Sequence, residues 1–274
     1  MTETSAPVLR PAAARARRRV PAPPRWLRKA SGPVLLLALW QLASAAGVLA
    51  PDVLPSPWAM AGTFGDLIGD GSLGEAMVSS LRRVALGLAI GGALGLLLAL
   101  AAGLSRLGED LVDAPMQMLR TLPWAGMIPL FIIWFGIDEQ PKIALVAFAV
   151  AFPLYLNVYA GIRNVDTTLV EAARTLGLGR PAMVRHVILP GAAAGTLVGL
   201  RYALGSAWLA LVFAEQVNAQ SGIGYLITHA REVYRTDIVV VALVVYAFLG
   251  LGADVLVRLL ERTLLSWRPA FSGT

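Results

Sequence analysis

The stretch EAARTLGLGRPAMVRHVILP, residues 171–190, has the composition of two short helices joined at a glycine. Small alanines lie in its first half, and arginines mark its second half. A DNA-binding helix-turn-helix has a similar pattern. A short loop between two membrane-spanning helices is similar too, so the flanking sequence has to separate the two interpretations.

The composition of the whole chain is that of a membrane protein. Of 274 residues, 57% are hydrophobic and 15% are charged, whereas soluble domains carry about 25% charged residues. The chain has no cysteine, which excludes disulfides and thiolate metal sites, and its two histidines are too few for a histidine metal cluster. We therefore expect neither a metal nor a cofactor.

Six apolar segments predict transmembrane helices, each of which needs roughly 20 apolar residues. They span residues 33–50, 80–104, 112–136, 141–162, 191–214 and 238–260. The third segment contains three prolines, so we expect it to be kinked. The predicted fold is an all-α, polytopic membrane protein with six transmembrane helices. Along the chain we expect a basic N-terminal tail at 1–32, the first transmembrane helix at 33–50, a core transmembrane domain at 78–262 and a C-terminal tail at 263–274.

The distribution of basic residues predicts that both termini are cytoplasmic. Cytoplasmic loops of membrane proteins are enriched in lysine and arginine, and this orientation places sixteen of the 23 basic residues inside and five outside. The predicted location is the cytoplasmic (inner) membrane, with the basic tail at anionic lipid. A cleavable signal peptide ending near Ala43-Ser44-Ala45 is the alternative for the N-terminal segment.

The quoted stretch then lies in a cytoplasmic loop between the fourth and fifth spans. A helix is predicted to start near Asp166 or Thr168, where Thr168 and Glu171 have capping-box spacing. Either Gly177 or Gly179 can end this helix with a positive φ.

The second half of the stretch is predicted to form another short helix. Pro181 suits its first turn, and Pro190 marks the start of the fifth span. A DNA-reading surface would be held close to the membrane and would have few polar side chains for reading bases. We therefore keep a membrane-tethered DNA-binding regulator only as a remote alternative, and we expect no nucleic acid partner.

The spacing of these residues resembles the EAA loop of permeases from binding-protein-dependent ABC importers. The pattern is Glu171-Ala172-Ala173, then Gly177, then Leu189-Pro190, with Val187 where the family usually has isoleucine. The resemblance continues after residue 33, for example in GLSRLGEDLVDAPMQMLRTLP at 103–123 and SGIGYLITHAREVYRTDIVVVA at 221–242. These segments are similar to the nitrate/sulfonate/taurine group, and most similar to its aliphatic sulfonate permeases.

The resemblance implies a type I ABC importer permease that moves a small anion, such as an aliphatic sulfonate, inward. Its implied partners are a second permease subunit in a homodimer, two ATP-binding subunits, an external substrate-binding protein and membrane lipid. The loop would be the coupling helix pair that docks on the ATP-binding subunit. The residues implied in coupling are Glu171, Ala172, Ala173, Gly177, Leu189 and Pro190.

The chain is predicted not to be an enzyme. It has no G-x-x-x-x-G-K-[ST] sequence, so ATP hydrolysis by a P-loop would require a separate subunit. A self-contained secondary transporter is the alternative function. Such transporters often contain internal repeats, but the first three and last three spans show no convincing repeat.

Two groups of residues within the spans are candidates for specific roles. Gly87, Gly91 and Gly95 are spaced four apart and predict close helix packing. Arg120 and Arg201 lie near mid-membrane in the third and fifth spans, where charged residues usually face a bundle interior or an aqueous cavity. Each arginine could line the substrate pathway or be paired structurally. The other candidate pathway or structural charges are Glu215 and Asp254, of which Asp254 is at a plausible depth to pair with an arginine.

Overall fold

The structure, a computed structural model, describes residues 25–265 as an assembly of helices without a strand in that part of the chain. The first elements are α1 (Arg25–Ala45), α2 (Pro57–Gly69), α3 (Ser72–Leu104), α4 (Arg106–Leu119), η1 (Trp124–Met127), α5 (Ile128–Phe135) and α6 (Glu139–Arg163). They are followed by α7 (Thr167–Thr175), α8 (Arg180–Met183), the π-helix η2 (Val184–Ile188), α9 (Leu189–Asn218), α10 (Ile223–Glu232) and α11 (Thr236–Leu264). Most of each predicted terminal tail, 1–32 and 263–274, lies outside the described residues.

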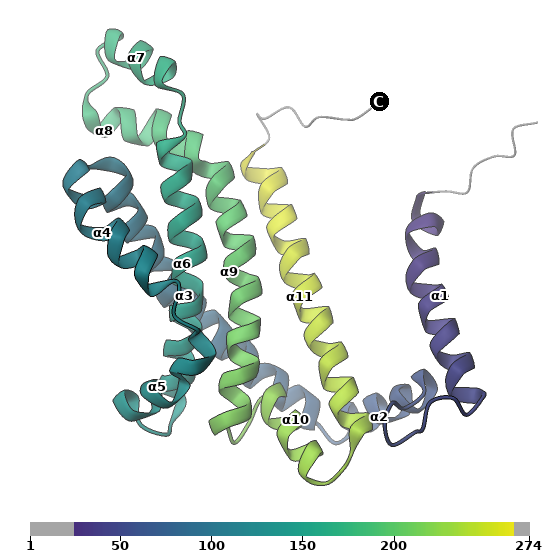
Figure 1. Cartoon of the computed structure of the whole chain (residues 1–274). Helices are drawn as coiled ribbons and strands as arrows, with labels where there is room; N and C mark the ends of the chain where they lie inside the picture. The colour runs from purple at the N-terminus through teal and green to yellow at the C-terminus, as the bar shows by residue number, and fades with distance from the viewer. Residues whose placement is uncertain (1–24, 266–274) are drawn as a thin grey trace, which may run out of the picture.

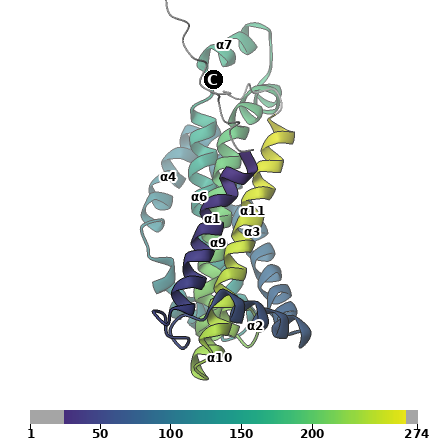
Figure 2. The ribbon, with the colours of Figure 1, turned by 90° about the vertical axis from the view of Figure 1, so that its right-hand side faces the viewer.

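The long helices run between two ends of the molecule (Figure 1). The α7–α8 hairpin, residues 167–188, projects beyond the bundle at one end, called here the hairpin end. Helices α2, α5 and α10 lie at the other end, called here the far end. Helix α1 stands apart from the other long helices in Figure 1 and passes in front of α9 and α11 in the perpendicular view of Figure 2.

The core lies where α6 packs between α3 and α9. The glycines at positions 87, 91 and 95 face α6, which confirms the packing predicted from their spacing. At Gly91 the approach is closest, because an added Cβ atom would collide with the carbonyl group of Ala147. Tyr155 and Leu211 are fully buried from the α6 and α9 sides of this core.

The prediction of six spans is only partly reproduced. In the described residues, four helices are long and apolar enough to cross a membrane, and a fifth span results if the bent pair α4 and η1–α5 is counted as one. The apolar part of α1, Ser31–Ala45, is shorter than such a span. The predicted first span of 33–50 was too long, because the helix ends at Ala45 and a turn with Gly47 at φ +72° follows.

The third predicted span, 112–136, is not one kinked helix. Helix α4 ends at Leu119, and the segment 124–135 continues at an angle of 87° to it. Pro123 lies in the break with φ −70° and ψ 101°. Proline has no N–H to donate and disfavours helical backbone in the residue before it, so this proline ends the helix, whereas Pro115 remains inside α4.

The close approach of α3 to α6 predicts that Gly91→Ala destabilises the protein by about 1–3 kcal/mol, the usual cost of overpacking. The control is Gly92→Ala, because a Cβ atom at Gly92 would meet only Leu154 Cδ2 at 3.8 Å. Unfolding of the purified protein in detergent measures both. Equal stability of the two variants would contradict the packing at Gly91.

Candidate functional site

The hairpin begins at Asp166, whose side chain caps α7. Asp166 Oδ1 accepts hydrogen bonds from the backbone N–H of Thr168 at 2.8 Å and from the Thr168 hydroxyl at 2.6 Å. These hydrogen bonds lower the pKa of Asp166, the one from the hydroxyl having the larger effect. The capping box predicted for Thr168 and Glu171 was wrong. Asp166 is the N-cap residue instead, because its carboxylate accepts from the backbone N–H of Thr168, and the helix begins at Thr167.

The first helix of the hairpin ends at Gly177, one of the two glycines predicted for this role. Gly177 has φ +80°, whereas Gly179 has φ −68° and begins the next helix. The N–H of Gly177 donates to the Arg174 carbonyl at 2.9 Å, and the N–H of Leu178 donates to the Ala173 carbonyl at 3.0 Å. This pair of hydrogen bonds is a Schellman motif, which fixes the direction in which the chain leaves α7.

The second helix of the hairpin continues into the bundle without a break. Pro181 lies in the first turn of α8, as predicted, but the helix then runs from Arg180 to Val217 over 38 residues. Pro190 therefore does not start the span, and the prediction of a boundary there was wrong. The π-helix η2 precedes this proline, and the N–H of Leu189 donates to the Val184 carbonyl. A wider turn accommodates a residue that cannot donate a backbone hydrogen bond.

Part of the predicted coupling set lies around one apolar groove of about 480 Å³ between α7 and the start of α9. Ala172, Ala173 and Pro190 line this groove, while Glu171, Gly177 and Leu189 do not. The adjoining apolar side chains are open to solvent, with Leu169 58% and Leu176 80% exposed. Exposed apolar surface outside a membrane-spanning segment is typical of a protein interaction site.

Polar contacts hold α4 against α6 below the hairpin. The Tyr159 hydroxyl donates to Glu109 at 2.7 Å, and the Tyr155 hydroxyl donates to Asp113 at 3.0 Å. Arg163 at the end of α6 lies 3.3 Å from the second oxygen of Glu109. The helix that leads into the hairpin is therefore fixed to α4 on one side and, through its core residues, to α3 and α9.

The far end of the bundle contains a buried ion-pair network centred on Arg83 of α3, whose exposure is 2%. Arg83 Nη1 donates to Glu215 Oε1 of α9 at 2.5 Å and to the Ser221 carbonyl at 2.6 Å. Its Nε and Nη2 atoms donate to the two oxygens of Glu139 on α6 at 2.7 and 2.8 Å. One guanidinium group therefore joins three long helices and the segment before α10.

Glu215 is the acidic centre of this network and is 1% exposed. Besides Arg83, its carboxylate accepts hydrogen bonds from the Ser80 hydroxyl, the backbone N–H of Gly224 at 2.8 Å and the Tyr246 hydroxyl at 3.2 Å. These contacts add α10 and α11 to the helices already joined. A buried carboxylate with this many partners is satisfied within its own chain.

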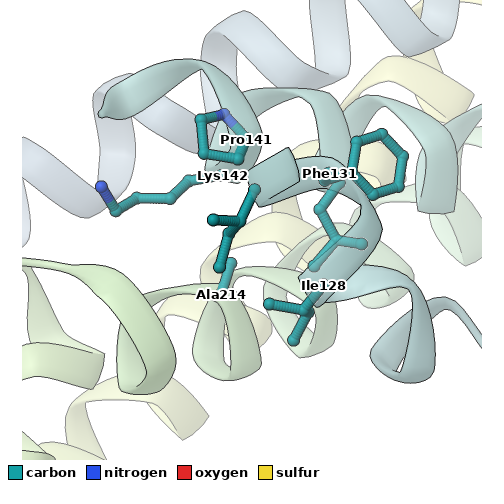
Figure 3. Close-up of a pocket in the computed structure, with 7 residues that line it drawn as sticks. Ile128, Phe131, Pro141, Lys142 and Ala214 are labelled. Atoms are coloured by element: carbon teal, nitrogen blue, oxygen red, sulfur yellow. The ribbon is translucent and has the colours of Figure 1, made fainter. Parts of the chain in front are cut away.

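The residue before Glu215 contacts a separate apolar cavity. Ala214 lines this cavity with Ile128 and Phe131 of α5 (Figure 3). Lys142 lies at its edge and extends away from the apolar side chains in Figure 3. The Lys142 amine instead donates to the Asp138 carbonyl at 2.9 Å and lies 3.3 Å from Glu139. Helix α9 thus carries an apolar contact and the charge network on neighbouring residues.

Arg201 is bound to carboxylates of α11. Its Nε atom lies 3.2 Å from Asp254 Oδ1, which is the pairing expected from their depth, and its Nη2 donates to Glu261 at 2.9 Å. The other oxygen of Asp254 lies 2.5 Å from Arg258. Two arginines and two carboxylates therefore balance one another between α9 and α11.

Arg120 has a different environment from Arg201. It follows the last residue of α4 at the break before η1, so it does not lie within a continuous span. Its side chain is exposed, and it has no ion-pair or hydrogen-bond partner in the part of the chain that the structure describes.

Comparison with known proteins accounts for this architecture. Residues 91–266 match the family of the "Binding-protein-dependent transport system inner membrane component". The chain belongs to this family. It is a permease subunit of an ABC importer, rather than the secondary transporter or the DNA-binding regulator considered as alternatives.

Several relatives of the permease match over most of their length. The "Putative aliphatic sulfonates transport permease protein SsuC" of Escherichia coli (strain K12) is 50% identical over 90% of this chain and 95% of the relative. The protein of the same name from Bacillus subtilis (strain 168) is 42% identical, covering 90% of each chain. The taurine transport system permease protein TauC of Escherichia coli (strain K12) is 32% identical over 85% of this chain and 86% of the relative.

Solved structures support the fold of the permease. A chain of an amino acid ABC transporter crystallised with histidines has a TM-score of 0.61 and 19% identity, covering 75% of this chain and 97% of that one. A chain of the MetNI methionine ABC transporter in an inward-facing conformation has a TM-score of 0.55 and 21% identity, covering 70% and 94%. At these identities the likeness concerns the fold alone.

The Arg83 network was not predicted from the sequence, where Arg83 counted only as one of the five basic residues placed outside. One signal was present. Arg83 continues the four-residue spacing of the glycines at 87, 91 and 95, which places it on the buried face of α3. Its partner Glu139 lies far away in sequence, so the pairing itself had no local signal.

Burial of the ion pair predicts that Arg83→Gln costs about 3–5 kcal/mol of stability, because it leaves the Glu215 charge without its cation. The exposed neighbour offers a control, Arg82→Gln, which should change stability by less than about 0.5 kcal/mol. The double variant Arg83→Gln with Glu215→Gln should recover part of the loss. Unfolding of the detergent-purified protein measures these variants and the single variant Glu215→Gln. A loss in the double variant equal to the sum of the two single losses would argue against the pair.

Proposed function

We propose that the permease imports alkanesulfonate anions across the cytoplasmic membrane. The support is the 50% identity to a relative named for aliphatic sulfonates, against 32% for the taurine relative and 31% for a nitrate import permease, NrtB, of Synechococcus elongatus. The proposed assembly contains two copies of this chain, two ATP-binding subunits and an external binding protein that delivers the substrate.

The hairpin is the proposed docking site for the ATP-binding subunit. Two features support this role. Its apolar groove and exposed leucines project beyond the bundle, and α8 is continuous with α9, so a push on the hairpin acts directly on a helix of the core. The residues proposed to make or shape the contact are Glu171, Ala172, Ala173, Gly177, Leu189 and Pro190.

The hairpin end is the proposed cytoplasmic end, with both termini on that side. The hairpin and its flanks contain four arginines, at 163, 174, 180 and 185. This enrichment fits the positive-inside rule. Arg83, which counted against the orientation in the sequence, no longer does so as a solvent-exposed charge, because it is buried and neutralised at the far end.

Arg120 is the proposed cation of the substrate pathway, and Arg201 and Glu215 are proposed to be structural. The guanidinium of Arg120 is exposed at a break between helices, whereas both other charges have partners within the chain. A guanidinium group presents two parallel N–H donors, which suit the oxygens of a sulfonate. A single exposed arginine binds the anion weakly enough for it to leave.

Uptake by the reconstituted complex tests the substrate. Vesicles containing this chain, its ATP-binding subunit and its binding protein should accumulate a labelled alkanesulfonate when ATP is supplied on the side of the ATP-binding subunit. Accumulation should be slower with taurine or nitrate. ATP-driven uptake of nitrate or taurine in preference to every alkanesulfonate offered would contradict the assignment while leaving the importer intact.

The positive φ at Gly177 predicts that Gly177→Ala weakens coupling. A side chain in this backbone region costs about 1–2 kcal/mol, which favours a different path out of α7. No atom lies within 4 Å of the added Cβ, so the effect comes from the backbone alone. Stimulation of ATPase activity by the loaded binding protein should fall, whereas Gly179→Ala, at φ −68°, should retain it. Equal stimulation in both variants would show that the geometry at Gly177 is not needed.

The pathway proposal predicts that Arg120→Gln lowers alkanesulfonate uptake by roughly tenfold, the size expected for loss of one charge-assisted hydrogen bond. Assembly and basal ATPase activity should stay normal. The control is Arg106→Gln at the other end of α4, which is also exposed and should transport normally. Normal uptake by Arg120→Gln would exclude a pathway role for this residue.

A further inference from the structure

A second cavity lies on the other side of the hairpin from the apolar groove. It has a volume of about 540 Å³ and is formed by the hairpin and the ends of α3 and α6. Three arginines line it, Arg163 from α6, Arg174 from α7 and Arg180 from α8, and no acidic residue is among its lining residues. Each of these three helices therefore contributes one positive charge.

Most of this charge is not neutralised within the chain. The side chains of Arg174 and Arg180 are exposed and have no ion-pair or hydrogen-bond partner within residues 25–265. Arg163 has one partial partner, Glu109 at 3.3 Å, and 48% of its side chain remains exposed. The cavity therefore attracts an anion with at least two guanidinium groups free to bind it.

Apart from Thr167, the remaining lining of the cavity is apolar, and it indicates what kind of anion fits. Leu104, Ile162, Val170 and Met183 line it beside the arginines. A small inorganic anion would leave these side chains without a partner. An amphipathic anion, with a phosphate at one end and hydrocarbon at the other, would satisfy both parts of the lining.

The position of the cavity also suits an amphipathic ligand. It lies where the apolar helices α3 and α6 end, between these helix ends and the projecting hairpin. In a membrane, phospholipid headgroups occupy this depth, and basic pockets at helix ends bind the headgroups of acidic lipids.

We propose that this cavity binds the phosphate of an anionic phospholipid, with Arg174 and Arg180 as the principal ligands and Arg163 as a third. The bound lipid would fill the space behind the hairpin and support α7 from the membrane side. The site depends only on the location of the chain in a membrane, and not on the substrate or on docking at the apolar groove.

Lipid binding to the purified complex tests this proposal. Binding of phosphatidylglycerol is measured by native mass spectrometry for the unchanged complex and for the variant Arg174→Gln with Arg180→Gln. Loss of two surface arginines should weaken binding by about 30-fold. The matched control is Arg106→Gln with Arg185→Gln, which removes the same charge from exposed residues that do not line the cavity and should bind nearly as tightly as the unchanged complex.

The remaining outcomes distinguish the sources of the anion. If phosphatidylglycerol binding weakened equally in both double variants, the lipid would be attracted to basic surface in general. That result would contradict a specific site in this cavity. Displacement of phosphatidylglycerol by excess inorganic phosphate would assign the cavity to a free anion and overturn the lipid proposal. If the first double variant does not assemble, a photoactivatable phosphatidylglycerol is applied to the unchanged complex. It should cross-link to the segments that line the cavity, within residues 103–104 and 162–188. Cross-links confined to other segments would contradict the proposal.

Discussion

The buried ion pair between Arg83 and Glu215 fixes the arrangement of the helices at the far end of the permease. Burying two charges costs free energy that their attraction offsets only when every remaining donor and acceptor is satisfied. Here Glu139, Ser221, Ser80, Gly224 and Tyr246 provide those contacts. Because the ion pair and these partners together come from five helices or their flanks, the network determines which helices are neighbours and in which register they pack.

The consequence is that α6 and α9 are held at one end and carry the hairpin at the other. Helix α6 packs closely on the glycine face of α3 and also against α9, so it cannot tilt independently without separating these contacts. Helix α8 continues into α9 through the π-helix η2, with no loop to absorb movement. We propose that this continuity passes displacement of the hairpin into the core of the permease.

Local chemistry made parts of the hairpin and the packing predictable from the sequence. Three inferences held: Gly177 ends a helix, Pro181 lies in the first turn of the next one, and the glycines at 87, 91 and 95 allow close helix packing. Each of these inferences depends only on backbone geometry within one or two turns. The pairing of Arg201 with Asp254 followed from depth in the membrane. Contacts between residues distant in sequence gave no such signal, and the Arg83 network consists almost entirely of them.

The errors also have physical causes. Hydropathy counts apolar residues but does not detect a change of direction, so the 87° bend after α4 was read as a kink within one span. Pro190 looked like a boundary because proline removes a backbone hydrogen bond, yet the π-helix before it keeps the helix continuous. In both places the tertiary packing decided how the backbone accommodates a proline.

Site-specific cross-linking most directly tests the central claim that the hairpin is where the permease meets its ATP-binding subunit. The chain has no cysteine, so Ala172→Cys introduces its only thiol, next to the apolar groove. In the assembled complex, a thiol-directed photo-cross-linker at this position should join the chain to the ATP-binding subunit. The same reagent on Tyr234→Cys, exposed at the far end, should not. Cross-linking from Tyr234→Cys but not from Ala172→Cys would contradict both the coupling role and the proposed orientation.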